Sequence, residues 1–203
     1  MKPLFISGIG TDIGKTVVSA ILVERLKADY WKPIQSGDLD NSDTKKVRAL
    51  VSNTISMFHQ ESYQLSQPFS PHKSAAIDGI EIDLKLISQP QTSKKLVIEG
   101  AGGLMVPLNK SQYIADLISH LDAEVILVVK HYLGSINHTL LSLELLKNRN
   151  IPLKGIIFNG ETDSYSEQAI LDHSKLSILG RVPMVNELNP EKIIELGKAL
   201  NID

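Results

Sequence analysis

The residues best suited to chemistry form a glycine-rich stretch near the start of the chain, Gly8-Ile9-Gly10-Thr11-Asp12-Ile13-Gly14-Lys15-Thr16. An apolar run precedes it and a helical pattern follows, which is the setting that a phosphate-binding loop requires. Backbone N–H groups of such a loop hold phosphate oxygens, so we expect Lys15 to bridge the outer phosphates of a nucleotide and the Thr16 hydroxyl to bind magnesium. The usual spacing has glycine where this chain has Ile9, and the alternative is an ordinary turn between a strand and a helix.

Phosphoryl transfer also needs carboxylates that hold magnesium and cations that offset the charge on the transferred group. Glu99 ends an apolar run and is followed by Gly-Ala-Gly-Gly, whose glycines let the backbone approach a ligand closely. We therefore predict that Glu99 holds the metal. Asp43 is a weaker candidate, because an Asp near a helix start is commonly a cap. Lys32, which ends another apolar run before Pro33, is either a surface lysine or a second cation of the site.

These residues belong to an alternation of apolar and helical segments. Strands are predicted at 4–6, 30–34, 96–98, 125–129, 153–158 and 178–179, and helices at 17–26, 42–51, 135–148, 164–173 and 191–200. Residues 66–80, with three prolines or glycines, are predicted to be a long irregular loop. Apolar strands separated by helices indicate an α/β fold, namely a three-layer P-loop NTPase-like fold with a mostly parallel central sheet and helices on both faces. We expect a single ATP-binding catalytic domain over residues 1–203.

In such sheets, ligands bind at the carboxyl ends of the strands. The polar residues that follow the predicted strands are therefore the candidates for a site: 8–16, 32–36, 99–103, 130–138 and Asn159. His131 and His138 fall within these segments, but the six histidines of the chain show no metal-ligand spacing, so we interpret both as structural.

Composition excludes several classes of function. The chain has 203 residues, a formal net charge of −2 and no cysteine. Without cysteine it has no disulfides, thiolate metal sites or cysteine nucleophile. The charge shows no excess of basic residues, so it gives no sign of a nucleic-acid partner. The longest apolar runs, such as 125–129, are too short to span a bilayer, and no signal peptide is visible. We expect a cytoplasmic protein with no nucleic-acid or membrane partner.

Several blocks together resemble one family, dethiobiotin synthetase. Besides the glycine-rich loop, the blocks are Tyr30 to Gly37, Asn41 to Asp43, Ser70 to His72, Val97 to Gly103 and Leu133 to His138, all in the family's order. The resemblance implies a ligase of biotin biosynthesis that converts 7,8-diaminopelargonic acid, CO2 and ATP, with Mg²⁺, into dethiobiotin, ADP and phosphate. It also implies a carbamate on one substrate amine, which the ATP γ-phosphate activates before the second amine closes the ureido ring.

The resemblance assigns roles to single residues. Lys15 and Lys32 would be the catalytic cations, and Thr16, Asp43 and Glu99 the magnesium ligands. Thr11, Asp12 and Ser36 would contact the amine end of the substrate, and Gly134, Ser135 and Asn137 its carboxylate end. The nucleotide would contact Asp12, Ile13, Gly14, Lys15, Thr16, Val17, Glu99 and Gly102, with Asn159 reading adenine beside a wall of Pro183, Met184 and Val185.

This chain departs from the family at two places. Many members carry Glu where this chain has Asp12, whose shorter side chain would reach the amine through water. A tyrosine that some members place after the adenine-binding strand has no firm counterpart, although Tyr165 lies near.

The carboxylate end of the substrate needs an anion site of its own. The helix predicted after Gly134 would supply one through its free N–H groups and positive dipole end. In the resembling family this loop comes from the neighbouring subunit, so the resemblance implies a homodimer with the active site at the interface. The alternative is that Gly134 and Ser135 only turn the chain and cap the helix.

Two other functions compete with this interpretation. A partitioning-type P-loop switch ATPase would carry a signature lysine early in the loop, where this chain has Gly10. An amidating ligase acting on corrin side chains would usually add a glutaminase domain with a catalytic cysteine, and this chain has no cysteine.

Overall fold

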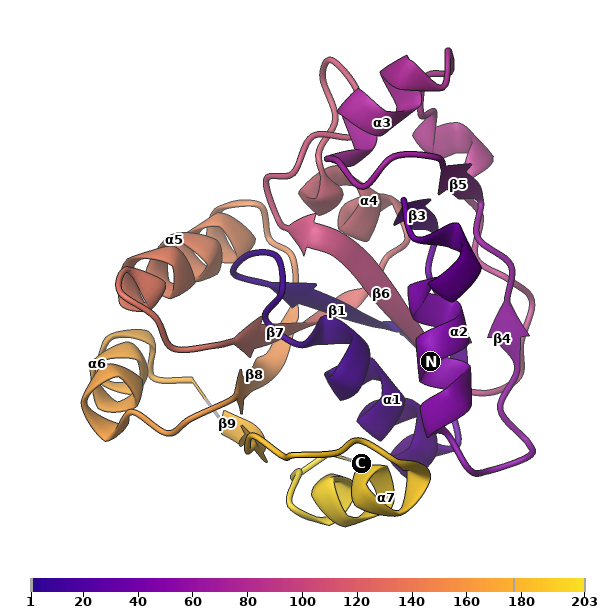
Figure 1. Ribbon diagram of the computed structural model, residues 1–203. Helices are drawn as coiled ribbons and strands as arrows, with labels where there is room; N and C mark the ends of the chain where they lie inside the picture. The colour runs from indigo at the N-terminus through magenta and orange to yellow at the C-terminus, as the bar shows by residue number, and fades with distance from the viewer. Residues whose placement is uncertain (1, 177, 203) are drawn as a thin grey trace.

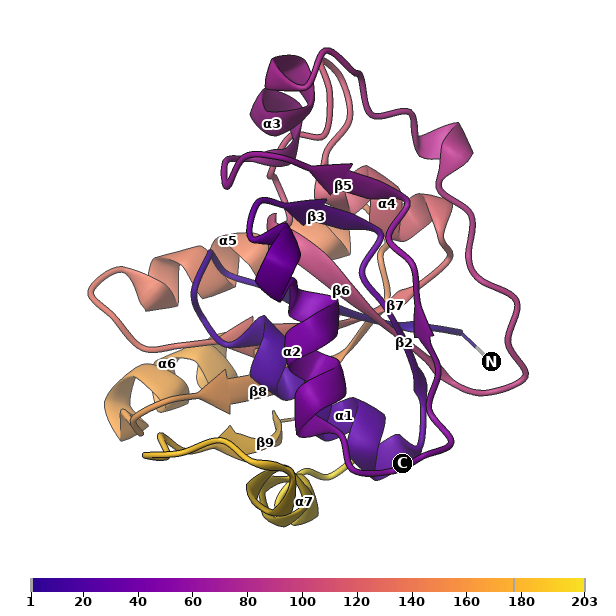
Figure 2. The ribbon, with the colours of Figure 1, turned by 45° about the vertical axis from the view of Figure 1, so that its right-hand side comes forward.

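The protein is described by a computed structural model that covers residues 2–176 and 178–202. Its centre is a seven-stranded sheet in the order β4-β2-β6-β1-β7-β8-β9, in which neighbouring strands run parallel (Figure 1). A separate two-stranded parallel sheet pairs β3 with β5 (Figure 2). The strands are β1 Leu4–Gly8, β2 Asp29–Trp31, β3 Ile34–Ser36, β4 Phe58–His59, β5 Tyr63–Leu65, β6 Leu96–Gly103, β7 Glu124–Val129, β8 Leu153–Asn159 and β9 Ile178–Val182.

Helices cover both faces of the central sheet, as the sequence predicts. One apolar cluster joins the sheet to α1, α2 and α7, and a second joins it to α3, α4, α5 and α6 (Figure 1). The helices are α1 Lys15–Leu26, α2 Asp43–Leu50, α3 Pro71–Ile77, α4 Ile114–His120, α5 Ser135–Asn148, α6 Ser164–Ser174 and α7 Pro190–Lys198, with short 3₁₀ helices η1 Leu39–Asn41 and η2 Leu84–Leu86. The predicted three-layer α/β fold is therefore confirmed.

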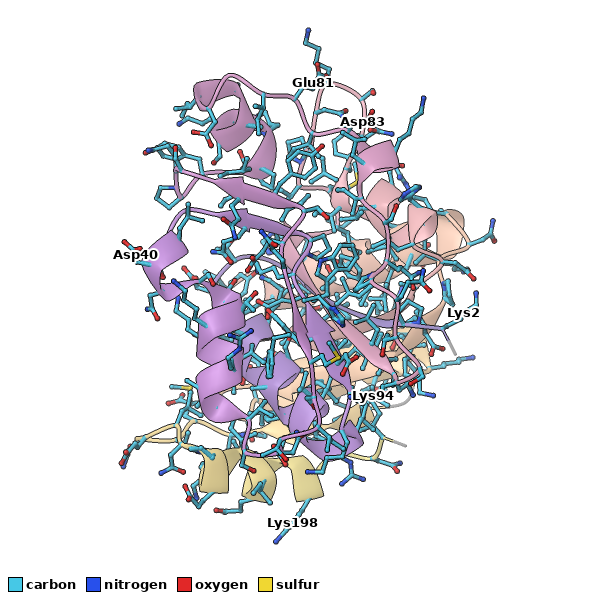
Figure 3. All side chains as sticks on the ribbon, turned by 90° about the vertical axis from the view of Figure 1, so that its right-hand side faces the viewer. Lys2, Asp40, Glu81, Asp83, Lys94 and Lys198 are labelled. Carbon is cyan, nitrogen blue, oxygen red and sulfur yellow. The ribbon has the colours of Figure 1, made fainter. Side chains whose placement is uncertain are left out.

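Strand β1 explains why the apolar runs show no polar alternation. Leu4 and Ile6 pack in the cluster with α1, whereas Phe5 packs in the opposite cluster, and all three are fully buried. A strand covered on both faces needs apolar side chains throughout. Charged side chains such as Asp40, Glu81 and Lys198 instead point away from the fold (Figure 3).

Two predicted segments are corrected. Residues 66–80 are not an irregular loop throughout, because α3 runs from Pro71 to Ile77. Pro71 is the first residue of α3, a position where the missing proline N–H costs no helical hydrogen bond. The strand predicted at 30–34 divides into β2 and β3, which belong to different sheets. The break falls at Lys32-Pro33, where proline lacks the N–H that a continuing ladder would use.

Other boundaries differ less. Ser42 caps α2, accepting a hydrogen bond from the Lys45 N–H. The last helix begins at Pro190 and ends at Lys198. Helix α4 lies in a part of the sequence for which no element was predicted. None of the described helices has both the length and the apolar character to cross a membrane.

Candidate active site

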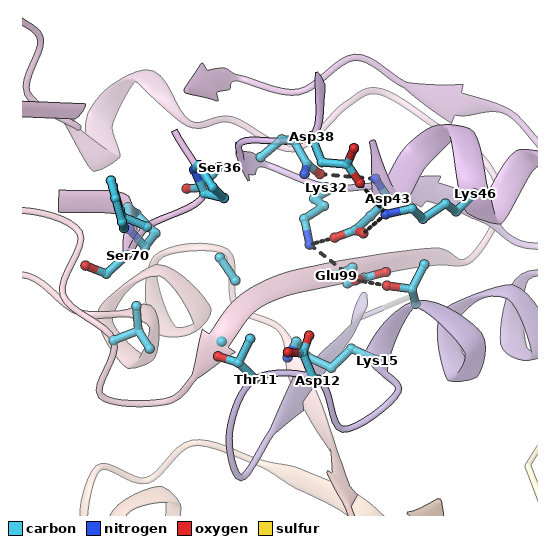
Figure 4. Close-up of a pocket in the computed structure, with 18 of the residues that line it drawn as sticks. Thr11, Asp12, Lys15, Lys32, Ser36, Asp38, Asp43, Lys46, Ser70 and Glu99 are labelled. Atoms are coloured by element: carbon cyan, nitrogen blue, oxygen red, sulfur yellow. Dashed lines mark hydrogen bonds and ion pairs between the residues drawn. The ribbon is translucent and has the colours of Figure 1, made fainter. Parts of the chain in front are cut away.

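A cleft of about 760 Å³ opens where the carboxyl ends of β1 and β6 meet the small β3–β5 sheet and the start of α2 (Figure 4). Its walls come from segments far apart in the chain, so the fold brings together the strand-end residues that the sequence singles out. The lining residues are Thr11, Asp12, Gly14, Lys15, Thr16, Lys32, Gln35, Ser36, Asp38, Asp43, Lys46, Pro68, Phe69, Ser70, Pro71, Glu99, Ala101, Gly102 and Val106.

The glycine-rich loop forms one wall of this cleft and leads directly into α1. Gly14 is the N-cap of the helix with φ 93°, a conformation that favours glycine, and a Cβ there would lie 2.1 Å from Asn159 Nδ2. Because Gly14 has no side chain to cap the helix, the first-turn amides remain available to a phosphate. Lys15 Nζ donates to the Gly10 carbonyl at 3.0 Å. Burial lowers the pKa of Lys15, while the Glu99 carboxylate opposes that shift.

The opposite wall holds a buried cluster of charged groups (Figure 4). Lys32 Nζ lies 2.5 Å from Asp43 Oδ2 and 3.2 Å from Glu99 Oε1. The Thr16 hydroxyl donates to the same Glu99 oxygen at 2.9 Å. Only 4% of Lys32 and 1% of Glu99 is exposed. Burial alone would lower the pKa of Lys32, but the Glu99 and Asp43 carboxylates outweigh it and raise that pKa, so Lys32 is a cation.

Asp43 is the first residue of α2 but does not act as its cap, because Ser42 takes that role. The Asp43 N–H donates to Gln35 Oε1 at 3.2 Å, and Gln35 Nε2 donates to the Gly37 carbonyl at 2.9 Å. Gln35 therefore links the loop after β3 to the start of α2. Burial would raise the pKa of Asp43, but Lys32 opposes it most strongly and the pKa is lowered. The Asp43 carboxylate is thus charged and faces the cleft.

Lys46 and Asp38 also line this cleft, and the sequence did not reveal either. Lys46 Nζ lies 2.7 Å from Asp38 Oδ2 and 3.9 Å from Asp43 Oδ1. The signal available in the sequence was the spacing of Lys46 three residues after Asp43, which places both on one face of a helix.

The donors gathered here suit magnesium. The Thr16 hydroxyl and the Glu99 and Asp43 carboxylates are hard oxygen donors; Thr16 bonds to Glu99, and Lys32 pairs with both carboxylates. Within residues 2–176 and 178–202, no group of three or more His, Cys, Asp or Glu side chains is placed to hold a metal ion. Two carboxylates and a hydroxyl match the way Mg²⁺ is bound with nucleotides, since phosphates and water complete its ligands.

Residues predicted to contact the substrate amines lie in the same cleft. Thr11, Asp12 and Ser36 all line it, together with Ser70 and Phe69 from the segment that precedes α3. The Ser36 hydroxyl oxygen is buried and has no hydrogen-bond partner among the described residues. Gly102, at φ 72°, approaches both the glycine-rich loop and Val106, and a Cβ there would lie 2.8 Å from Val106 Cγ2.

The residues predicted to bind adenine lie at the ends of β8 and β9. Asn159 Nδ2 donates to the Ile13 carbonyl at 2.8 Å, so the asparagine braces the glycine-rich loop. Asn159 pairs with Val182, and the segment from Pro183 to Val185 therefore starts beside it. The described residues that line the cleft do not include Asn159, Ile13, Val17 or this segment.

Gly134, Ser135 and Asn137 lie at the start of α5, beyond the end of β7, and they too stand outside the lining of the cleft. Gly134 is the N-cap with φ 105°, a conformation that favours glycine. Nearby, Tyr132 Oη and His138 Nδ1 lie 2.8 Å apart. One chain therefore does not bring the predicted carboxylate site into contact with the cleft.

Comparisons with known proteins show the family of this chain. The sequence model of a family described as an AAA domain matches residues 2–192. The chain is 60% identical over 181 residues to the ATP-dependent dethiobiotin synthetase BioD of Christiangramia forsetii, covering 89% of this chain and 87% of that protein. It is 50% identical over 194 residues to the protein of the same name from Cytophaga hutchinsonii, covering 95% and 94%. The chain belongs to the dethiobiotin synthetase family.

Solved structures place the fold of this dethiobiotin synthetase family member in a wider group. A ParA family ATPase from Chlorobium tepidum superposes with a TM-score of 0.58 at 15% identity, covering 97% of this chain and 98% of that one. The septum site-determining protein MinD from Pyrococcus horikoshii, in complex with Mg-ADP, gives 0.59 at 14% identity, covering 98% and 95%. At these identities the likeness shows the shared fold alone.

Proposed function

We propose that this chain is an ATP-dependent dethiobiotin synthetase, a ligase that forms C–N bonds from 7,8-diaminopelargonic acid, CO2 and ATP. The observation that carries this proposal is one cleft with a phosphate loop on one wall and Lys32, Asp43 and Ser36 on the other. Such a cleft has room for nucleotide phosphates and a second substrate face to face. Identity of 60% to a protein named for this activity supports the same assignment.

The chemistry divides between the walls. A carbamate oxygen on the substrate attacks the γ-phosphorus of ATP, and the bond to ADP breaks. The second amine then attacks the carbamate carbon, loses a proton and expels phosphate, which closes the ring. Lys15 and the loop amides hold the phosphates, whereas Lys32 stabilises the charge that develops during transfer. Thr16, Asp43 and Glu99 would hold Mg²⁺, which neutralises phosphate charge when bound.

The amine end of the substrate would meet Thr11, Asp12 and Ser36. The buried Ser36 hydroxyl has no partner among the described residues and so gains a hydrogen bond when the substrate binds. Adenine would lie at the ends of β8 and β9, with Asn159 Oδ1 accepting from its amino group and Pro183 to Val185 alongside. We assign these roles to a single catalytic domain, residues 1–203, that works in the cytoplasm without nucleic-acid or membrane partners.

The product assay is direct. Purified protein is incubated with diaminopelargonate, bicarbonate as the source of CO2, and Mg-ATP, and dethiobiotin is sought by mass. ATP hydrolysis should depend on the diamine. A switch ATPase would hydrolyse ATP without it and respond to lipid or nucleic acid instead, so turnover that ignores diaminopelargonate would reject the synthetase assignment.

We also propose a homodimer in which α5 of one subunit completes the site of the other. Gly134, Ser135 and Asn137 begin a helix whose free amides suit the substrate carboxylate. Leu133 and Leu141 are exposed apolar side chains on or beside this helix, as an interface would require.

Mixing two inactive chains tests the shared site. One chain carries Lys32→Ala and the other carries a bulky residue at Gly134. Heterodimers should recover part of the activity, because one of the two mixed sites would be intact. A fully active monomer, or no recovery in demonstrated heterodimers, would reject the shared site.

A further inference from the structure

One oxygen of Glu99 is bound from outside the cleft. Tyr30 Oη donates a hydrogen bond to Glu99 Oε2 at 2.9 Å. Tyr30 lies on β2, two residues before Lys32, and is fully buried. It does not belong to the described lining of the cleft, so no ligand in the cleft need touch it.

The two oxygens of Glu99 therefore have different surroundings. Oε1 receives the Thr16 hydroxyl at 2.9 Å and faces Lys32 Nζ at 3.2 Å, whereas Oε2 receives Tyr30. Three donors, one on α1, one on β2 and one directly after β2, surround one buried carboxylate. Of these, Thr16 and Lys32 both line the cleft and are expected to meet ligands. Tyr30 is the donor that remains when they exchange partners.

We propose that Tyr30 is a positioning residue for the magnesium site. By holding Glu99 Oε2, it keeps Glu99 Oε1 turned toward Thr16, where that oxygen can bind the metal. The inference rests on the proposed function only in taking Glu99 as a magnesium ligand. Partners that hold a metal ligand from behind orient it, and they are often needed for metal affinity.

A further observation agrees with a permanent donor. The ring is held independently of the hydroxyl, because it packs against Phe58 with centroids 6.0 Å apart and belongs to the cluster under α1. Phenylalanine would keep that packing and remove only the donor.

The test compares nucleotide affinity with and without magnesium. Calorimetry on the Tyr30→Phe protein measures binding of a non-hydrolysable ATP analogue in MgCl2 and in EDTA, and the ratio of the two affinities reports how strongly the metal is held. We expect this ratio to fall about tenfold, as when an outer partner of a metal ligand is lost, while the affinity in EDTA stays unchanged. Tyr63→Phe is the matched control, because the Tyr63 hydroxyl, on the small sheet, bonds to the backbone of Asp83 and to no side chain among the described residues. Its ratio should not change.

A second variant shows whether Tyr30 acts through Glu99. In a Glu99→Gln background, adding Tyr30→Phe should lower the ratio less than twofold further. An unchanged ratio in folded Tyr30→Phe protein would overturn the proposal, as would equal losses in both backgrounds. If the Tyr30→Phe protein does not fold but the Tyr30→Phe, Glu99→Gln double variant does, the result supports the pairing of hydroxyl and carboxylate. If neither protein folds, Tyr30 serves packing and the proposal is overturned. No diamine enters these measurements, so they stand apart from whether dethiobiotin is made.

Discussion

Buried carboxylates occur at both ends of the central sheet, and they differ in whether backbone amides are among their described donors. At the carboxyl ends of the strands, Glu99 is surrounded by the side chains of Thr16, Lys32 and Tyr30. At the opposite end of the sheet, here called the far region, Glu24 on α1 accepts from two backbone amides, those of Ser52 at 2.8 Å and Asn53 at 2.9 Å.

The second carboxylate of this region, Asp29, combines one backbone donor with side-chain donors. Asp29 accepts from the Met57 amide at 2.8 Å and from the Thr92 hydroxyl at 2.6 Å, with Lys94 Nζ at 3.2 Å. These bonds join the start of β2 to the residues that precede β4 and β6. Lys94 reaches this network from the surface (Figure 3).

The comparison separates structural from functional buried charge. Backbone amides are held by the fold and cannot turn away, so the carboxylates of the far region stay paired for as long as the chain is folded. Side-chain donors such as Lys32 rotate and can exchange a carboxylate for a phosphate, leaving that carboxylate for a metal. Buried acids with side-chain partners in a cleft are therefore the ones to test for function.

The largest expected effect comes from Lys32→Ala. Without this cation, Asp43 and Glu99 face each other unneutralised and the transferred phosphate loses a preorganised partner, so kcat should fall about a hundredfold, or about 3 kcal/mol. ATP affinity by calorimetry should change much less. Lys94→Ala, which removes a lysine from Asp29 instead, should leave kcat unchanged.

Lys15→Ala sharpens that result, because Lys15 belongs to the phosphate loop and should contact ATP in the ground state. Its loss should weaken ATP binding as well as turnover. If Lys32→Ala abolished ATP binding and Lys15→Ala did not, the assigned division between the two walls would be reversed.

Glu24→Gln should cost about 3 kcal/mol of stability at pH 7 with no loss of activity. Burial alone would raise the pKa of Glu24, but hydrogen bonds from Lys27, Asn53 and Ser52 lower it from 4.5 to about 2. Because the folded-state pKa is depressed, this stabilisation is complete above pH 4.5 and is lost as pH falls toward 2.

Urea unfolding of the parent and of Glu24→Gln between pH 7 and pH 3 measures the difference in their free energies of unfolding, which should become smaller as pH falls. Glu195→Gln removes an exposed carboxylate paired with Lys192 and should scarcely change stability. A gap between Glu24→Gln and the parent that stays constant with pH would contradict the ionic origin of the effect.

Glu99→Gln should raise the magnesium concentration needed for half-maximal activity about tenfold, because it removes a metal-holding charge and keeps the size. Circular dichroism should show an intact fold. Unfolding would instead indicate that Glu99, like Glu24, is needed for the stability of the fold.

The smallest effect is expected from Lys46→Ala. Lys46 is over a third exposed and pairs with the exposed Asp38, so the pair should contribute less than about 1 kcal/mol to stability. Urea unfolding checks this value. A loss of kcat close to that of Lys32→Ala would instead show that Lys46, like Lys32, acts as a cation of the active site.

Much of this arrangement could be predicted from the sequence, because the strands are covered on both faces and read as continuous apolar runs. The runs ending near Gly8 and Glu99 predicted which polar residues share an edge, and Thr11, Lys15, Lys32 and Glu99 do line one cleft. The roles assigned to these residues remain predictions.

The missed features share a physical cause. Helix α3 is short and begins with proline, and α4 is short as well, so neither gives a long periodic pattern. Tyr30 read as one more apolar residue of a strand, because nothing in the local sequence reveals that its hydroxyl meets Glu99, 69 residues away. Contacts of that range depend on strand order, which periodicity does not determine.

That strand order also bears on how the protein is made. β1 lies in the middle of the sheet, where Leu4 pairs with Val97 on β6 and with Glu124 on β7. A chain emerging from the ribosome presents β1 and its phosphate loop first, yet neither edge of that strand has a partner until β6 and β7 have followed. High contact order of this kind slows folding and leaves apolar edges open to aggregation. Nucleotide binding should therefore appear late in synthesis, after most of the chain has been translated.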